Sequence, residues 1–203
     1  MCSDVEKFVR FCETPFGKQI LSKEIEYIAR ELQGYTNILD VGCGIGAFEQ
    51  RLPHLYIIGL DISEDMLDEA RTRSEKTFIQ GNAEDLPFDD AAFDAVFTVA
   101  TLEFLDDYRQ AIKEIFRVTK PYGKFVALIL NPESEYFQSE ILKPGDYFNR
   151  MKHLDVQAIK NFTSTFYSNV KSEYLLGIKN RDVFDTADMK FASIFSIIGQ
   201  KLV

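Results

Sequence analysis

The sequence predicts an α/β fold in which a doubly wound, mostly parallel sheet carries helices on both of its faces. Short apolar runs alternate with helical patterns along most of the chain, and this alternation is typical of such a sheet. The first run, 37–41, leads directly into a glycine-rich stretch, 42–46. Asp40 closes the first run and Asp61 the second, 21 positions apart. A glycine-rich turn and an acidic residue so spaced hold nucleotide-like ligands in this fold class.

The elements follow from local signals taken in order along the chain. The first helix is expected at 15–33, because Thr14 suits its N-cap and Gly34 its end. Apolar residues recur along it at the helical spacing. Further helices are expected near 46–52, 64–74, 108–118 and 155–168. Seven strands are expected near 37–41, 56–61, 77–80, 93–99, 123–130, 172–179 and 192–200.

The glycine-rich stretch restricts the class of nucleotide-like ligand that the fold can bind. Glycines adopt backbone torsions closed to other residues, and the N–H groups at a helix start favour anionic groups. A P-loop needs Gly-Lys-Ser/Thr there, but Gly46 is followed by Ala47, which argues against ATP or GTP. The dinucleotide pattern G-x-G-x-x-G/A is matched by Gly42, Gly44 and Ala47. Asp40 repels a pyrophosphate, however, and it can help to hold the ammonium of S-adenosylmethionine, which has no phosphate.

Four blocks of sequence, in order, resemble the class I S-adenosylmethionine-dependent methyltransferases. Within that family they resemble the methyltransferase type 11 branch, which includes ubiquinone- and menaquinone-biosynthesis enzymes. A weaker match, 13–17, is similar to the segment that enters the family's domain and covers its site. The resemblance spans roughly residues 11–131, and its blocks are 38–46, 59–67, 81–96 and 117–124.

The resemblance implies a Rossmann-like, seven-stranded sheet whose last strand is antiparallel and inserted. It also implies one methyltransferase domain over residues 1–203. Within that domain, 1–33 is expected to be an N-terminal helical cover, and 131–170 a variable segment on the substrate side. Aromatic residues and turn formers mix within 133–150, which favours a mobile lid there.

The same resemblance assigns roles around the cofactor. The glycine-rich loop would surround its methionine part with Asp40 near the ammonium, and Asp61 would bind the ribose hydroxyls. Ile62 and Met66 would flank the adenine. Asn82 stands where the family often has Asp, and its amide oxygen can still accept a hydrogen bond. The full set is Asp40, Gly42, Cys43, Gly44, Gly46, Asp61, Ile62, Met66, Asn82, Ala83 and Thr98.

Methyl transfer needs no dedicated catalytic side chain, because the sulfonium already activates the methyl group and alignment of the reacting atoms suffices. The candidates for a base or a substrate contact are Glu103 and His153. Glu103 stands where many relatives carry His, and His153 lies in the variable segment. The other histidine, His54, is expected on the surface. No metal site is expected, because the spacing of the cysteines is not a ligand pattern; they are Cys2, Cys12 and Cys43.

Composition and charge restrict the kinds of partner and the cell compartment that we expect for this protein. The net charge of −9 argues against nucleic acid, which needs a basic face. No apolar run approaches the ~20 residues of a membrane span. The few scattered cysteines and the lack of a signal-peptide pattern favour the cytoplasm. We therefore expect a small-molecule methyl acceptor, left open between carbon, nitrogen, oxygen and sulfur; the oligomeric state is not specified.

Two other readings remain at this point. One is a protein that binds S-adenosylmethionine without catalysis. The other is an NAD(P)-dependent dehydrogenase, supported by the G-x-G-x-x-A match and by the Tyr-x-x-x-Lys spacing of Tyr167 and Lys171. That spacing arises easily by chance. The dehydrogenase reading also leaves Asp40 unexplained.

Overall fold

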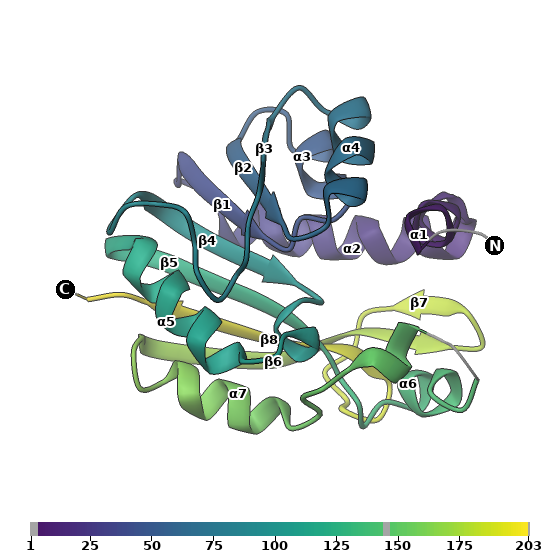
Figure 1. Cartoon of the computed structure of the whole chain (residues 1–203). Coiled ribbons are helices and arrows are strands. Elements are labelled where there is room, and N and C mark those ends of the chain that lie inside the picture. Colours follow the sequence, from purple (N-terminus) through teal and green to yellow (C-terminus); the bar gives the residue numbers. More distant parts are fainter. Residues whose placement is uncertain (1–3, 144–146, 203) are drawn as a thin grey trace.

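The computed structural model describes residues 4–143 and 147–202. Its sheet has eight strands in the order β3-β2-β1-β4-β5-β8-β6-β7. β1 to β5 pair in parallel, and β8 inserts antiparallel between β5 and β6 (Figure 1). The strands are β1 (Asn37–Val41), β2 (Tyr56–Asp61), β3 (Thr77–Gln80), β4 (Phe93–Val99), β5 (Thr119–Leu130), β6 (Ser168–Lys179), β7 (Asp182–Phe184) and β8 (Ala192–Gln200).

The fold class is confirmed, whereas the expected count of seven strands is wrong. The additional strand is β7, which folds back on β6 through a turn at Asn180 and Arg181. Both turn residues have positive φ, at 52° and 68°. Glycine is the usual residue in this conformation, so a strand of three residues after a turn without glycine leaves little trace in sequence.

Helices cover both faces of the sheet. α2, α3 and α4 lie on one face and α5 and α7 on the other (Figure 1). Alternate residues of each strand face the two layers, so Ile38 packs under α2 while Leu39 packs toward α5. The helices are α1 (Asp4–Glu13), α2 (Pro15–Glu31), α3 (Ala47–Arg51), α4 (Glu64–Arg73), α5 (Tyr108–Val118), α6 (Glu135–Glu140) and α7 (Val156–Thr163), with 3-10 turns η1 (Leu102–Phe104) and η2 (Tyr147–Arg150).

The capping signals of the first predicted helix act as expected. The Thr14 hydroxyl accepts a hydrogen bond from the Gly17 amide at 2.9 Å, and Pro15 opens α2. The helix ends at Glu31, and Gly34 follows with φ 89°. The preceding helix, α1, lies within the expected helical cover 1–33 but has no range of its own, and the short α6 has no counterpart among the expected helices.

The strand order reverses between β1 and β4. The chain builds β1, β2 and β3 toward one edge and then returns to add β4 and β5 on the other side of β1. In doubly wound sheets, ligands bind at the carboxyl ends of the strands at this reversal. Among the described residues, no helix combines the length and apolar character needed to cross a membrane.

Candidate functional site

The glycine-rich loop crosses the carboxyl end of β1 at the strand reversal. The amides of Gly42 and Cys43 both donate to the Leu60 carbonyl, at 2.7 and 3.0 Å, which holds the loop against β2. Gly42 has φ 82°, and a Cβ there would lie 2.2 Å from the Thr101 Oγ1 atom. Glycine is therefore required at this position by conformation and by the approach of the segment after β4.

Replacing Gly42 with alanine tests that requirement. We expect a loss of about 2–5 kcal/mol in the free energy of unfolding, from a strained φ and an overpacked contact together. Gly34→Ala is the matched control, because Gly34 has φ 89° with no atom within 4 Å of an added Cβ. That control should lose only about 1–2 kcal/mol. Urea unfolding measures both, and equal losses would contradict the crowding at Gly42.

Asp61 fastens the loop to the end of β2. Its Oδ2 atom accepts the Gly44 amide at 2.9 Å, and its Oδ1 atom accepts the Ser63 amide at 2.9 Å. Each carboxylate oxygen has a second lone pair, so the side chain can still accept further hydrogen bonds. Among the described residues, a Cβ built on Gly44 would have only Phe8 of α1 as a neighbour within 4 Å, at 3.9 Å, which places α1 over the loop.

Asp40 and Glu49 form a buried carboxyl pair beneath the loop. Asp40 Oδ2 and both Glu49 oxygens lack a hydrogen-bond partner within the described part of the chain. Asp40 lies beside Gly59, and a Cβ on Gly59 would sit 3.0 Å from Glu49 Oε1, so that glycine makes room for the second carboxyl. Burial and the neighbouring Glu49 raise the pKa of Asp40 well above its usual range. Burial also raises the pKa of Glu49 to about 7. Two such carboxyls bond to each other only when one carries a proton.

The residues expected around the adenine gather near the ends of β2 and β3. Ile62 is 69% exposed, and Met66 is half-buried in the first turn of α4. The Ser63 hydroxyl caps α4 by accepting the Met66 amide at 3.3 Å. Asn82 uses its side-chain oxygen to accept the Glu84 amide at 2.9 Å, and Ala83 beside it is buried.

Thr98 and Cys43 are more enclosed than their expected roles require. Thr98 is buried in β4, and its hydroxyl donates to the Val41 carbonyl at 2.8 Å, so this donor joins β4 to β1. Burial raises the pKa of the Cys43 thiol, which leaves it uncharged. Cofactor contact by either side chain stays a prediction.

The two catalytic candidates lie in different settings. Glu103, on η1 directly after β4, is fully buried, and its Oε1 atom accepts the Leu130 amide at 2.8 Å. His153 instead bonds the Leu105 carbonyl through Nε2 at 3.0 Å and packs against the Tyr108 ring. The His153 ring thus lies against Leu105 and the start of α5, while its backbone amide donates to the Glu103 carbonyl at 3.1 Å. His54 is exposed before β2, as expected.

Sequence reasoning missed two carboxyls at this end of the sheet, Glu24 and Glu49, whereas Tyr147 belongs to the aromatic residues of 133–150 expected on the substrate side. Glu24 is 8% exposed on α2, between the core residues Leu21 and Ile25. A carboxylate within the apolar stripe of a helix is the signal that could have found it. Glu49 carries no such signal, because only the packed fold brings it beside Asp40.

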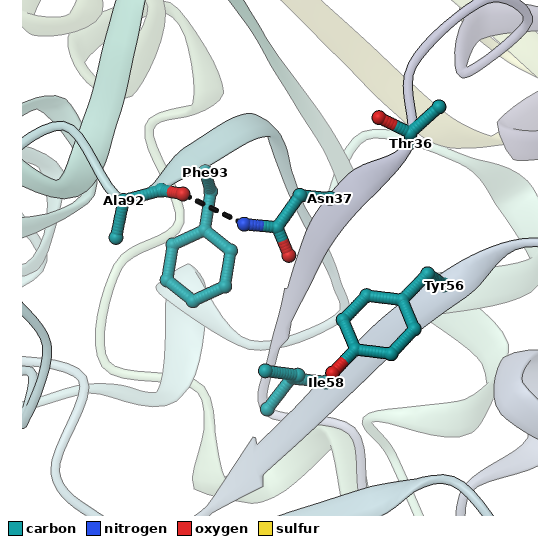
Figure 2. Close-up of a pocket in the computed structure, with 6 residues that line it drawn as sticks. All are labelled: Thr36, Asn37, Tyr56, Ile58, Ala92 and Phe93. Atoms are coloured by element: carbon teal, nitrogen blue, oxygen red, sulfur yellow. Dashed lines mark hydrogen bonds between the residues drawn. The ribbon is translucent and has the colours of Figure 1, made fainter.

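Two other features, a surface hollow and the Tyr167–Lys171 pair, lie outside the site. A hollow of about 610 Å³ lies at the amino ends of β1, β2 and β4, where Asn37 Nδ2 donates to the Ala92 carbonyl at 2.7 Å (Figure 2). Tyr167 is buried against Phe125, with its hydroxyl 3.3 Å from the Thr119 Oγ1 atom near the start of β5. Tyr167 and the exposed Lys171 thus lie far along the sheet from the glycine-rich loop, and the dehydrogenase reading loses its catalytic pair.

Known proteins are similar to this chain in both sequence and fold. The methyltransferase domain family matches residues 39–127. A demethylmenaquinone methyltransferase of Shouchella clausii is 34% identical over 185 residues, covering 83% of this chain and 77% of that protein. The chain belongs to the class I S-adenosylmethionine-dependent methyltransferases. It falls in their methyltransferase type 11 branch, which is similar to the ubiquinone- and menaquinone-biosynthesis enzymes, and its cofactor is S-adenosylmethionine.

Two further relatives extend over nearly the whole methyltransferase. An uncharacterized protein of Methanocaldococcus jannaschii is 27% identical over 198 residues, covering 93% of this chain and 86% of that one. A crystal structure described as a possible histamine N-methyltransferase, from Thermotoga maritima, superposes with a TM-score of 0.83. The superposition covers 98% of this chain and 96% of the Thermotoga chain at 23% identity. At this identity the similarity supports the fold only, and not a substrate.

Proposed function

We propose that this methyltransferase moves the methyl group of S-adenosylmethionine to a small-molecule acceptor at the carboxyl ends of β1 and β4. The observation that carries the proposal is the unpartnered oxygen of buried Asp40 next to an open glycine loop. A buried carboxyl without a donor is costly, and a ligand ammonium at the loop would satisfy it. Phosphate ligands offer no such group.

The residues fit the cofactor in the following arrangement. The loop from Gly42 to Gly46 encloses the methionine part, with Asp40 toward the ammonium. Asp61 accepts hydrogen bonds from the ribose hydroxyls through its free lone pairs. The exposed side chain of Ile62 and that of Met66 flank the adenine, with the remaining predicted contacts at Cys43, Asn82, Ala83 and Thr98.

The cofactor supplies a methyl group activated by a positive sulfur. The protein must hold the acceptor in line with the breaking bond at about 3–3.5 Å and keep water out. The strand ends suit both tasks, because η1 is hydrogen-bonded there to the end of β5 and to the segment after it, and this packing buries the strand ends. Any proton that the acceptor releases needs a nearby base, and Glu103 is the buried carboxyl at that position.

We propose that 1–33 and 131–170 form the cover of this single domain. Asp4 of α1 pairs with Arg150 of η2 at 2.9 Å, which joins the two segments across the site. One aromatic contact also joins them, since Phe16 meets Tyr136 with ring centroids 5.8 Å apart, and within 131–170 Phe137 meets Phe148 at 5.2 Å. Such a lined enclosure favours a small acceptor over a nucleic acid, as does the net charge of −9. We place the reaction in the cytoplasm.

Calorimetric titration with S-adenosylhomocysteine, NADH and NADPH tests the proposal. We expect the first compound to bind with one-to-one stoichiometry and the two nicotinamide nucleotides to give no heat of binding. Binding of NADH or NADPH alone would overturn the assignment. Binding of S-adenosylhomocysteine without turnover on any acceptor would favour the non-catalytic binding protein.

A further inference from the structure

A second pair of buried carboxyls, distinct from the Asp40–Glu49 pair, comes from α2 and η1. Glu103 is fully buried on η1, and Glu24 of α2 is 8% exposed. The charge of Glu103 contributes to the raised pKa of Glu24, so the two carboxyls lie within electrostatic range of each other although they are 79 positions apart in sequence. α2 and η1 thus bring two acidic groups together where an acceptor would sit.

Neither carboxyl is fully satisfied. Glu103 Oε2 has no hydrogen-bond partner among the described residues, although Oε1 accepts the Leu130 amide. Glu24 makes no hydrogen bond or ion pair with any residue that the structure describes. Burial raises the pKa of Glu24 to about 8, with a further contribution from Glu103, and burial raises that of Glu103 to about 7. Natural proteins rarely keep such a pair without a ligand or a catalytic use for it.

Aromatic groups border the pair on its open side. The Tyr147 ring packs on Phe104 at 4.5 Å, and its hydroxyl donates to the Ala100 carbonyl at 3.3 Å. Tyr147 is 45% exposed as a whole. The packing around its hydroxyl and the charges of Glu103 and Asp61 raise the pKa of Tyr147. Its hydroxyl therefore lies within electrostatic range of both Glu103 and the carboxylate proposed to hold the ribose. Aromatic faces beside carboxyls are a favourable setting for a cation.

We propose that Glu24 and Glu103 bind a basic nitrogen of the acceptor, so that this enzyme methylates a small primary or secondary amine. The inference rests on the proposed methyltransferase function and names its substrate class. A cationic nitrogen would supply the donors that both carboxyls lack. A neutral ring acceptor would leave at least one of them unpaired and buried, at a cost in free energy.

Methyl transfer to such an amine begins with the loss of a proton from nitrogen. The acceptor enters as an ammonium and gives one proton to Glu103 Oε2, which frees the nitrogen lone pair. The nitrogen attacks the methyl carbon, and a nitrogen–carbon bond forms as the carbon–sulfur bond breaks. The bonding electron pair stays on sulfur and yields neutral S-adenosylhomocysteine. The product is the methylated ammonium, which Glu24 continues to hold until release.

The test uses the full chain with methyl-labelled S-adenosylmethionine and a panel of aliphatic, aryl-ethyl, imidazole and polyamine substrates. Tyramine and 4-ethylphenol form a matched pair that differs in the amine, and a demethylated naphthoquinol is included. We expect label on amines, and none on 4-ethylphenol or the quinol. Label on the quinol or phenol alone, or on none of the panel by a protein that binds S-adenosylhomocysteine, would overturn the inference.

Variants of Glu24 and Glu103 test whether these two carboxyls bind the amine. We expect Glu103→Gln to lower kcat/KM for the amine at least about 100-fold and Glu24→Gln at least about 10-fold, mainly through KM. The amide oxygen introduced by Glu103→Gln can still accept the Leu130 amide, and both variants should bind S-adenosylhomocysteine like the wild type. The rise of kcat with pH should disappear in Glu103→Gln, which a purely structural role would not produce.

Glu26→Gln is the control, because Glu26 is exposed on α2 two residues from Glu24. It should leave amine methylation unchanged. Wild-type kinetics in both Glu24→Gln and Glu103→Gln would refute the amine site while leaving the methyltransferase assignment intact. If the wild-type protein did not bind S-adenosylhomocysteine, that result would instead refute the proposed function, and this inference would fail with it.

Discussion

Replacing Asp61 with alanine should weaken binding of S-adenosylhomocysteine by about 5- to 150-fold. Removing a buried acceptor from two ribose hydroxyls leaves donors unpaired, which costs about 1–3 kcal/mol. The variant also loses the acceptor for the Gly44 amide at 2.9 Å, so the glycine-rich loop loses a tie to β2. Both effects act on the same ligand contact. Calorimetry measures the change in affinity, and circular dichroism checks that the fold persists.

Two controls separate these effects. Asp61→Asn keeps an oxygen that can accept the Gly44 amide but removes the charge, so its loss of affinity should be smaller than that of Asp61→Ala. Asp89→Ala alters an exposed aspartate in the loop before β4 and should bind like the wild type. An affinity of Asp61→Ala within twofold of wild type would exclude Asp61 as the ribose contact.

Much of the sheet could be predicted because its signals are local. The runs 37–41, 56–61, 77–80 and 93–99 coincide with β1 to β4, since a short buried strand is nearly all apolar and ends where polar residues begin. β8 coincides with 192–200, and its antiparallel insertion agrees with the resemblance. β5 and β6 begin four residues earlier than expected, at Thr119 and Ser168. Their starts are polar and extend beyond the apolar run, so packing rather than composition sets these ends.

The site was predictable to the extent that backbone conformation dictates sequence. Gly42 is specified by its own torsion and by the Thr101 contact, so a glycine pattern reports the loop directly. Buried carboxyls have no such pattern. Glu49 is an ordinary helix residue by sequence, and only the approach of Asp40 and the space above Gly59 make it exceptional. Tertiary contacts of this kind are what a single sequence does not display.

The Asp40–Glu49 pair should also make stability depend on pH, which Glu49→Gln would reveal. The pKa of Glu49 lies at about 7 in the folded protein against an ordinary value of 4.5. Below about pH 4.5 both states hold the proton, so stability is unaffected. Above it the unfolded chain ionises while the folded protein keeps its proton, and the free energy of unfolding falls as pH rises to about 7. A gap of this size corresponds to about 3 kcal/mol.

The glutamine side chain introduced by Glu49→Gln does not titrate, so the stability of this variant relative to wild type should rise by about 2–3 kcal/mol between pH 4.5 and 7.5. The amide can also donate to Asp40, which favours ionised Asp40 and adds to the difference in the same direction. Urea unfolding at five pH values measures the two curves. Glu75→Gln, at an exposed position before β3, is the control and should run parallel to wild type. Parallel curves for Glu49→Gln as well would show that the carboxyl pair holds no proton in the folded protein, which would contradict the raised pKa of Glu49.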